Sequence, residues 1–273
     1  MKLWISISLS FLLVTISEGR ASCDFNESLK TIYSLSGPVT IALKELELLK
    51  SRKLKGLSVF HPITADEFKG EFLPGGIFLS REHLQKMKGS LIFLDESREL
   101  NRMLKSVEGM TLEEIKTRGL TPLEVTEQVS LVLKKYLQNC EDKILKLQNK
   151  SKALAAEILS KTPGNLTAIF YLGQIRPPRL PDMVMVNDGI VKWLKDEVKL
   201  KTYPSELAYV SWSAKIIQEM PKETWHIGIM DSGRELKKEV MKLEAKKLNF
   251  TYPGSLIPGL SQLEAWLYLI NSF

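Results

Sequence analysis

Hydrophobic and polar residues alternate along the first part of the chain in a way that predicts strands and helices in turn. Short apolar runs that stop at glycine, proline or polar residues are typical of buried strands, and apolar residues at helical spacing are typical of helices packed on a sheet. The expected strands are 31–37, 55–64, 89–97 and 109–115. The expected helices are 40–50, a helix capped by Ser80 after a glycine-marked loop at 72–79, and 97–107. This alternation predicts a mostly parallel sheet with helices on both faces.

The middle of the chain predicts two long helices in succession. Thr121 caps the first of them, 121–137, with Pro122 at its first position and Glu124 at its third. This is a capping box in which the missing N–H of proline costs nothing. A second helical pattern, 142–160, stops shortly before a Pro-Gly pair. At 1.5 Å per residue this helix is about 28 Å long, which is enough to connect two lobes.

The strand and helix alternation restarts in the last part of the chain. The expected strands are 166–173 and 225–233, with 249–253 a short strand or a loop. The expected helices are 185–198, a turn leading into a helix at 208–220, 234–248 and 259–273. The predicted fold class is therefore α/β, with two lobes of mostly parallel sheet flanked by helices and bridged by one long helix. The expected segments are a signal peptide at 1–21, an N-terminal α/β lobe at 22–139, a bridging helix at 140–162 and a C-terminal α/β lobe at 163–273.

The first residues have the pattern of a secretory signal peptide. A basic residue precedes an apolar run at 3–16, and Gly19 and Ala21 place small residues where a signal peptidase needs them. The run is too short for a convincing membrane span. Cys23 allows a lipoprotein interpretation, but Arg20 stands where a lipobox needs an apolar residue. We therefore expect a periplasmic chain released by the signal peptide, with a lipid anchor at Cys23 as the less favoured alternative.

Charge and composition narrow the classes of partner. The net charge of +6 falls to +5 once residues 1–21 are removed, and the excess is spread along helices such as 234–247. No aromatic interleaving accompanies these basic residues, so we interpret them as a solvated face and expect no nucleic-acid partner. With 44% hydrophobic and 26% charged residues, the chain has the composition of a globular protein.

The sequence contains two cysteines, Cys23 and Cys140. Two cysteines are too few for disulfides to hold a fold of this length together, and the sequence leaves open whether they pair in an oxidising compartment. There is no Cys-x-x-Cys motif and no cluster of histidine and cysteine. We therefore expect no resident metal and no other cofactor.

A stiff cationic loop follows the expected strand 166–173. Arg176 and Arg179 flank Pro177-Pro178 in this loop. Ligand sites of open parallel sheets form outside the carboxyl ends of the strands, which makes the loop a candidate binding segment. A guanidinium group at Arg179 suits a carboxylate or phosphate on a ligand. A solvent-facing turn is an equally good interpretation of the position alone.

Four segments of the sequence carry a family resemblance. They are IYSLSGPVTIALKELELLKSRKLKGLSVF at 32–60, LSREHLQKMKGSLIFLDES at 79–97, YPSELAYVSWSAKIIQEMPKETWHIGIMDSG at 203–233 and PGLSQLEAWL at 258–267. In this order they resemble the ABC-importer substrate-binding proteins for cobalamin, heme and ferric siderophores. The resemblance implies two α/β lobes bridged by a rigid helix, with a metal chelate held between them. It also implies no catalysis, a monomeric protein, and delivery of the ligand to an ABC permease in the inner membrane.

The resemblance also implies ligand-facing positions. On this sequence they fall on Phe60, Ile77, Phe78, Arg179 and Tyr209. The loop at 75–78 lacks the tryptophan or tyrosine that cobalamin and heme binders place there, and the segment 251–259 lacks an arginine. The identity of the ligand is therefore open.

Two more candidates come from residue chemistry. His61 stands at the end of an expected strand, where neutral imidazole is able to ligate a chelated metal. The alternative is a structural histidine before a proline. Tyr252, like the other aromatic candidates, offers a flat wall of the kind found in ligand pockets, or belongs to the core.

Docking to a permease is implied to need an acidic residue on each lobe. The candidates are Glu67 or Glu71 and Asp188 or Glu206. Each of these residues is alternatively an ordinary surface acid.

Two other classes of function stay open. A secreted hydrolase is suggested by Asp231-Ser232-Gly233 with His226 upstream, but no GxSxG, HExxH, P-loop or GxGxxG motif is present. A repurposed secreted two-lobe binding protein without a transport role is the other alternative. N-glycosylation sequons consistent with a secreted glycoprotein stand at Asn26, Asn149, Asn165 and Asn249.

Overall fold

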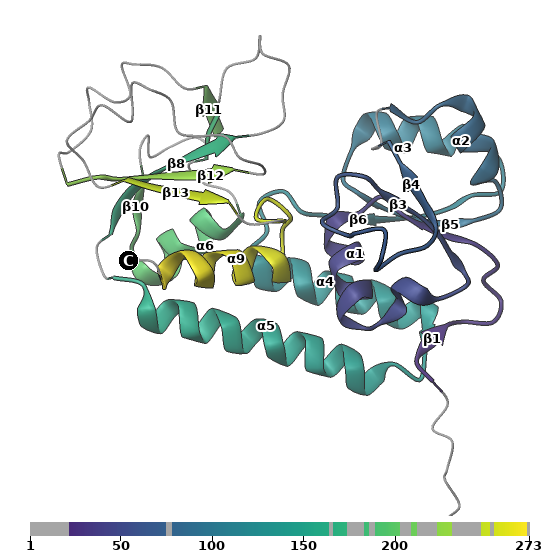
Figure 1. Ribbon diagram of the computed structural model, residues 1–273, viewed down its shortest axis with the longest axis horizontal. Coiled ribbons are helices and arrows are strands. Elements are labelled where there is room, and N and C mark those ends of the chain that lie inside the picture. Colours follow the sequence, from purple (N-terminus) through teal and green to yellow (C-terminus); the bar gives the residue numbers. More distant parts are fainter. Residues whose placement is uncertain are drawn as a thin grey trace, which may run out of the picture.

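The computed structural model shows two lobes side by side, joined at their base by helices (Figure 1). The residues that it describes are 22–74, 78–163, 166–173, 183–185, 189–202, 209–211, 223–230, 247–251 and 254–271. Within these ranges only the backbone is described for 98–99, 170–173, 183–185, 209–211, 228–230 and 247–251. The expected signal peptide and the expected helices at 212–220 and 234–246 lie outside the described residues.

The N-terminal lobe is built on a parallel sheet with the strand order β4-β3-β2-β5-β6. Its strands are β2 (Ile32–Ser34), β3 (Leu54–Ser58), β4 (Glu71–Leu73), β5 (Leu91–Asp95) and β6 (Thr111–Ile115). Its helices are α1 (Gly37–Glu45), the short 3-10 helix η1 (Leu48–Lys50), α2 (Arg81–Lys86) and α3 (Arg98–Lys105). The connections reverse direction between β2 and β5, so the topological switch point lies at the carboxyl ends of these two strands.

Local chemistry explains most of these elements. Residues 91–94 of β5 are all buried, as expected of a central strand covered on both faces. The side chains of Ser36 and Ser80 cap α1 and α2 by accepting from backbone N–H groups. Two details of the sequence interpretation were wrong: β3 ends at Ser58 rather than beside His61, and the segment taken for a loop is preceded by the edge strand β4.

The N-terminus is fixed to the base of the lobe. Strand β1 (Asp24–Phe25) pairs antiparallel with β7 (Leu137–Gln138). Beside this pair Cys23 and Cys140 form a disulfide across 117 positions of sequence. The sulfur of Cys23 is thereby used, so a lipid anchor at this residue and the observed pairing exclude each other.

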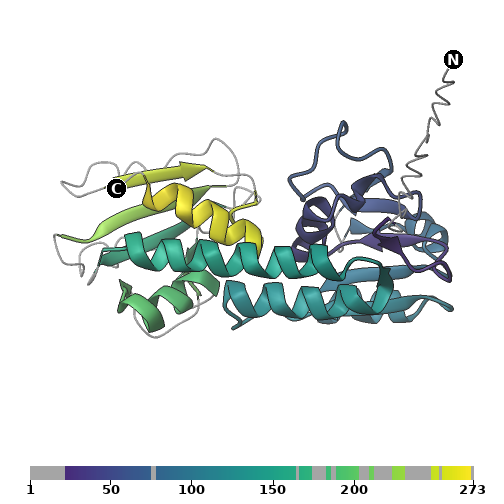
Figure 2. The same cartoon turned by 90° about the horizontal axis from the view of Figure 1, so that it is seen from below.

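The two long helices predicted in the middle of the chain are present. Helix α4 (Pro122–Tyr136) has the capping box of Thr121 and Glu124, and α5 (Glu141–Lys161) follows it. Figure 2 shows α5 running beneath both lobes, with α4 beside its first half. Ile144 of α5 lies in the core of the N-terminal lobe and Ile158 in that of the C-terminal lobe. Helix α5 therefore bridges the lobes, as the sequence predicted.

The C-terminal lobe contains a six-stranded mixed sheet. Its strands are β8 (Thr167–Gly173), β9 (Met183–Met185), β10 (Lys201–Thr202), β11 (Tyr209–Ser211), β12 (Trp225–Met230) and β13 (Lys247–Thr251). Strands β10, β12 and β13 run parallel to β8 or to each other, whereas β9 and β11 are antiparallel to their neighbours. The described helices are α6 (Gly189–Val198) and α9 (Leu260–Ile270).

Three sequence expectations for this lobe were wrong. Residue 185 belongs to a strand, and the helix expected to begin there starts at Gly189. The expected turn at 209–211 is strand β11, and the last two residues of the expected helix 234–248 belong to β13. The short antiparallel strands have three residues each, too few to show an alternating pattern.

Candidate functional site

The carboxyl ends of the two sheets face one another across the junction between the lobes. On the N-terminal side, the chain beyond β3 brings Pro62 against Gly254, which follows β13, and the chain beyond β2 brings Gly37 against Ile257. On the same side the carbonyl of Gly119, in the loop after β6, accepts a hydrogen bond from Lys192 Nζ of α6. Ligand sites of parallel sheets form outside these ends, so the candidate site lies between the lobes.

The N-terminal wall of this site exposes large apolar side chains. Val59, Phe60 and Phe78 are 49%, 61% and 63% exposed, although they are apolar. The backbone N–H of Val59 donates to the carbonyl of Leu73, and the N–H of Phe60 donates to Ser58 Oγ. The loops after β3 and β4 therefore leave the sheet side by side. Adjacent exposed apolar side chains such as Val59 and Phe60 are typical of a surface that binds a ligand or a partner.

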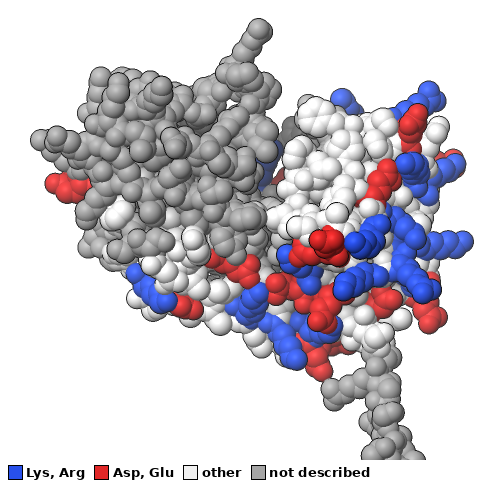
Figure 3. All heavy atoms as spheres, viewed as in Figure 1, with Lys and Arg blue, Asp and Glu red and all other residues white. Residues whose placement is uncertain are grey.

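The distribution of charge agrees with this arrangement. Figure 3 shows that the part of the N-terminal lobe nearest the other lobe is mostly uncharged, whereas lysines, arginines and acids gather at its outer end. Sequence reasoning found Phe60 and Phe78 but missed Val59. The signal was the apolar pair Val-Phe directly before His-Pro, at the end of a strand.

His61 is placed differently from its aromatic neighbour. It is 9% exposed, its backbone N–H donates to the carbonyl of Ser58, and its Nδ1 is buried without a hydrogen-bond partner. Burial lowers the pKa of His61 to about 4, so the ring is neutral at neutral pH. The near-complete burial of the residue favours the structural interpretation of His61.

The remaining candidates are placed in part or not at all. Ile77, Arg179 and Tyr252 lie outside the described residues. Tyr209 belongs to β11, and its side chain is not described. The structure places the start of the loop that carries Phe60 and His61 beside the end of β4, through the hydrogen bond from Val59 to Leu73, and leaves the rest of the site as a prediction.

A carboxylate that sequence reasoning missed lies at the switch point. Asp95, the last residue of β5, accepts from Ser36 Oγ at 2.6 Å and from the N–H of Gly37 at 3.3 Å. Burial raises the pKa of Asp95 to about 6, although both hydrogen bonds oppose this rise. The contacts tie the end of β5 to the start of α1 and fix the floor of the site on this side. The signal in the sequence was an acid directly after a fully apolar strand.

The two docking candidates on the N-terminal lobe have partners within the lobe. Glu67 pairs with Lys44 at 2.7 Å and accepts from the N–H of Thr64 at 2.9 Å. Glu71 pairs with Lys86 at 2.9 Å. The hydrogen bonds from Lys44 and Thr64 lower the pKa of Glu67. Asp188 and Glu206 lie outside the described residues.

A polar hollow of about 590 Å³ flanks the site along α3 and β6. It is lined by Glu96, Asn101, Arg102, Lys105, Ser106 and Glu114. Both signs of charge are present, and Asn101 donates to Glu114 within the hollow. Sequence reasoning did not single out these residues.

The described residues contain neither a metal-binding cluster of side chains nor a membrane-spanning helix. In that part of the chain no three histidine, cysteine, aspartate or glutamate side chains cluster as a metal site would require. None of the described helices is long and apolar enough to cross a membrane.

Comparison with known proteins places the fold. No family model matches the sequence, and no curated protein matches it. Solved structures do match. The periplasmic heme-binding protein HutB of Vibrio cholerae has a TM-score of 0.67 at 16% identity, covering 89% of this chain and 98% of that one. The periplasmic vitamin B12-binding protein BtuF of Vibrio cholerae has a TM-score of 0.60 at 14% identity over 89% and 98% of the two chains.

A third structure is similar to the same extent. An ABC transporter substrate-binding protein from Listeria monocytogenes has a TM-score of 0.58 at 12% identity over 89% and 98% of the two chains. The chain thus has the two-lobe α/β fold of the substrate-binding proteins that it resembles in sequence. The recognition made from the sequence is confirmed at the level of the fold.

Proposed function

We propose that this protein is an extracytoplasmic solute-binding protein that captures a metal chelate between its lobes for an ABC importer. The observation that carries the proposal is the exposure of the apolar side chains Val59, Phe60 and Phe78, the first two of them in the loop whose Pro62 lies against Gly254 of the other lobe. A ferric siderophore, heme or cobalamin presents a large, partly apolar surface to such a wall. Proteins of this fold that are named for heme and vitamin B12 support the ligand class.

The C-terminal wall completes the proposed site. We assign it Arg179, Tyr209 and Tyr252, and to the N-terminal wall we add Ile77. Arg179 supplies the donors for a carboxylate or phosphate of the ligand. His61 supports the loop from within the lobe rather than reaching the metal, because the residue is almost entirely buried.

The proposal includes the location and the partner. The disulfide of Cys23 and Cys140 fits an oxidising compartment such as the periplasm, and residues 1–21 act as a signal peptide. The protein binds as a monomer, performs no catalysis and carries no resident cofactor. Its partner is a permease in the inner membrane, which meets acids on both lobes.

The test is a thermal-shift titration of residues 22–273 with hemin, cyanocobalamin and a set of ferric siderophores. A ligand that binds only the native state stabilises it by RT ln(1 + [L]/Kd), so the melting temperature rises with the logarithm of the ligand concentration once that concentration exceeds Kd. We expect such a concentration-dependent rise with one of them, and a much smaller rise in Phe60→Ala and in Arg179→Ala. Leu145→Ala is the matched control, because Leu145 is 55% exposed on α5, away from the site. No rise with any chelate contradicts the proposal.

A repurposed binding protein without a transport role is the second candidate. It is favoured by the ion pairs of Glu67 with Lys44 and of Glu71 with Lys86, because a permease arginine would have to compete with these lysines. Ligand binding without stimulation of any cognate importer's ATPase in reconstituted membranes would favour this candidate. No observation favours a hydrolase, since His226 is buried within β12 rather than at its carboxyl end.

A further inference from the structure

The segment 254–259 crosses from the C-terminal lobe to the N-terminal lobe, and we call it the clasp. It follows β13 and leads into α9. It touches the N-terminal lobe at three places that belong to different elements. These are Pro62 in the loop after β3, Gly37 at the start of α1, and Val125 with Thr126 on α4.

The contacts of the clasp are close. A methyl group on Gly37 would lie 2.9 Å from Ile257 Cγ2, and one on Gly254 would lie 3.1 Å from Pro62 Cγ. A methyl group on Gly259 would lie 3.3 Å from Thr126 Oγ1. Carbon atoms rest at about 3.5–4.0 Å from one another. At each of these three glycines the two lobes therefore approach more closely than a residue with a side chain would allow.

The clasp has a fixed shape of its own. Gly254 and Gly259 have φ of +79° and +94°, which glycine adopts readily and other residues do not. The carbonyl of Gly254 accepts from the N–H of Ile257 at 2.9 Å and from Ser261 Oγ at 3.0 Å. A turn closed in this way acts as a rigid spacer rather than as a slack linker.

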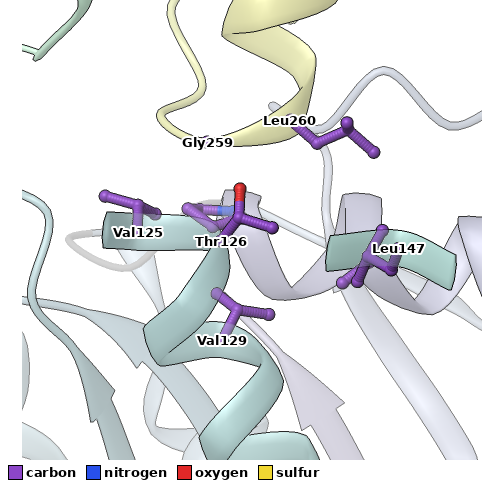
Figure 4. A pocket seen from close by; sticks show the side chains of 8 residues that line it. Val125, Thr126, Val129, Leu147, Gly259 and Leu260 are labelled. Carbon is purple, nitrogen blue, oxygen red and sulfur yellow. The ribbon is translucent and has the colours of Figure 1, made fainter. Parts of the chain in front are cut away.

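The helix that follows anchors the clasp. Figure 4 shows Leu260, next to Gly259, beside Val125, Thr126 and Val129 of α4 and Leu147 of α5. Leu260 belongs to the core of the N-terminal lobe, whereas Leu263 and Trp266 of the same helix belong to the core of the C-terminal lobe. The space left between these side chains is only about 10 Å³. The junction is therefore packed without room to slide.

Polar bonds contribute little where the clasp meets the loop after β3. His61 Nδ1 and Ser255 Oγ belong to the two segments that meet at Pro62 and Gly254, and both are buried without a hydrogen-bond partner. Unpaired buried polar groups cost free energy. The fit between the lobes here is consequently set by shape, through glycine, proline and isoleucine.

From these contacts we infer that the clasp sets the spacing between the two lobes, and that the contact of Ile257 with Gly37 determines this spacing. The loop that carries Phe60 reaches the C-terminal lobe through Pro62 and Gly254, so a ligand that moves this loop also moves the clasp. The effect on lobe spacing needs no ligand. Its effect on ligand affinity rests on the proposed function.

The test measures the distance between spin labels on the two lobes by pulsed electron resonance. The labels are attached at the exposed residues Lys88 and Glu197 through a ketone-bearing unnatural amino acid, which leaves the disulfide intact. Gly37→Ala adds one methyl group in a backbone conformation open to any residue. We expect a longer mean distance, because Ile257 must move by roughly 1 Å to restore normal contact.

The double variant Gly37→Ala/Ile257→Ala removes the obstructing side chain, and its mean distance is expected to return to that of the wild type. Ser255→Ala is the control within the clasp and should leave the distance unchanged. If Gly37→Ala fails to fold, Ile257→Ala alone keeps the test, with an expected shorter distance. Unchanged distances in Gly37→Ala and Ile257→Ala, with wild-type circular dichroism, overturn the inference. So does a shift in Gly37→Ala that persists in the double variant.

A second arm separates the inference from the proposed function. Affinity for whichever chelate raises the melting temperature of the wild type is measured in the same variants. A changed spacing with unchanged affinity would support the role of the clasp in lobe spacing and contradict its effect on ligand binding. The absence of any bound chelate contradicts the proposed function and leaves the distance measurement valid.

Discussion

The N-terminal lobe is held together from within, whereas the described part of the C-terminal lobe relies on helices whose other ends lie in its neighbour. The N-terminal sheet has a core on each face and a disulfide that closes the lobe. The described core of the C-terminal lobe is assembled largely from α5, α6 and α9, and both α5 and α9 also enter the other lobe. The comparison teaches that the two lobes are separate in shape, but that the stability of each depends on helices that both lobes share.

The largest expected effect tests whether the lobes unfold together. Phe93→Ala and Trp266→Ala remove buried aromatic side chains, 0% and 2% exposed, from the N-terminal and the C-terminal core. Each is expected to lower the free energy of unfolding by about 3–5 kcal/mol. Because α5 and α9 serve both cores, urea denaturation should show one transition that either variant shifts. Two transitions, each sensitive to only one of the variants, would contradict the shared stability.

Removing the disulfide should weaken the lobe that is closed from within. Cys23→Ser/Cys140→Ser frees a loop of 117 positions, for which chain entropy predicts a loss of about 4–5 kcal/mol as an upper value. Urea denaturation of the wild type with and without reductant measures this loss of free energy of unfolding. The double serine variant is the control, since reductant should not affect it. An unchanged free energy of unfolding on reduction would show that β1 and β7 hold the terminus without the disulfide.

Two buried titrating groups of the N-terminal lobe should have opposite effects on how stability changes with pH. His61 has a pKa lowered to about 4 from 6.5, so the unfolded chain binds more protons in this window and stability falls as the pH drops. Asp95 has a pKa raised to about 6 from 3.8, so the folded chain binds more protons and stability falls as the pH rises. Each contribution is at most about 3 kcal/mol, and together they should leave the wild type nearly flat.

The opposing slopes separate in single variants. His61→Asn leaves the contribution of Asp95, so its melting temperature should fall from pH 4 to pH 6. Asp95→Asn leaves the contribution of His61, so its melting temperature should rise over the range from pH 4 to pH 6.5. Thermal melts in buffers of constant ionic strength measure both. Parallel profiles for the two variants would refute the assignment of these groups.

The smallest expected effect concerns the ion pairs at the junction. Lys150 of α5 pairs with Glu45 at the end of α1 at 2.8 Å and with Glu264 of α9 at 2.7 Å. Burial lowers the pKa of Lys150, but the hydrogen bonds with Glu264 and Glu45 outweigh it and raise that pKa. The side chains are 26–40% exposed, so Lys150→Met should cost no more than about 1 kcal/mol.

Lys161→Met is the matched control for this pair. Lys161 bonds to Glu157 and to Asn271, both within the C-terminal lobe or its bridging helix. Urea denaturation should give losses of similar size for the two variants. A much larger loss for Lys150→Met would mean that charge, and not only packing, joins the lobes.

The sequence predicted the N-terminal lobe better than the C-terminal one for a physical reason. Long apolar runs and side-chain caps are local signals, and they located β5, α4 and α5 to within a residue or two. Strands β4, β9 and β11 have three residues each and owe their conformation to pairing with neighbours distant in sequence. Their sequences show no strand pattern of the kind that predicted β2, which is equally short.

The candidate site shows the same limit. Phe60 was predicted to line the site from the family resemblance, and its exposure fits that position. The burial of His61, next to it, goes with the contact of Pro62 and Gly254, which lie far apart in the sequence. The pairing of the two cysteines likewise depended on where β1 and β7 meet. The candidates at Ile77, Arg179, Tyr209 and Tyr252 stay predictions.

The place of Leu260 has a consequence for how the protein is made. The core of the first lobe includes this residue, which lies more than 100 positions after the other members of that core. Ribosomes deliver a chain from its amino terminus, and domains generally fold as units when their residues have emerged. The core of the first lobe is therefore complete only after residue 260 has emerged. Until then part of its apolar surface stays open to chaperones.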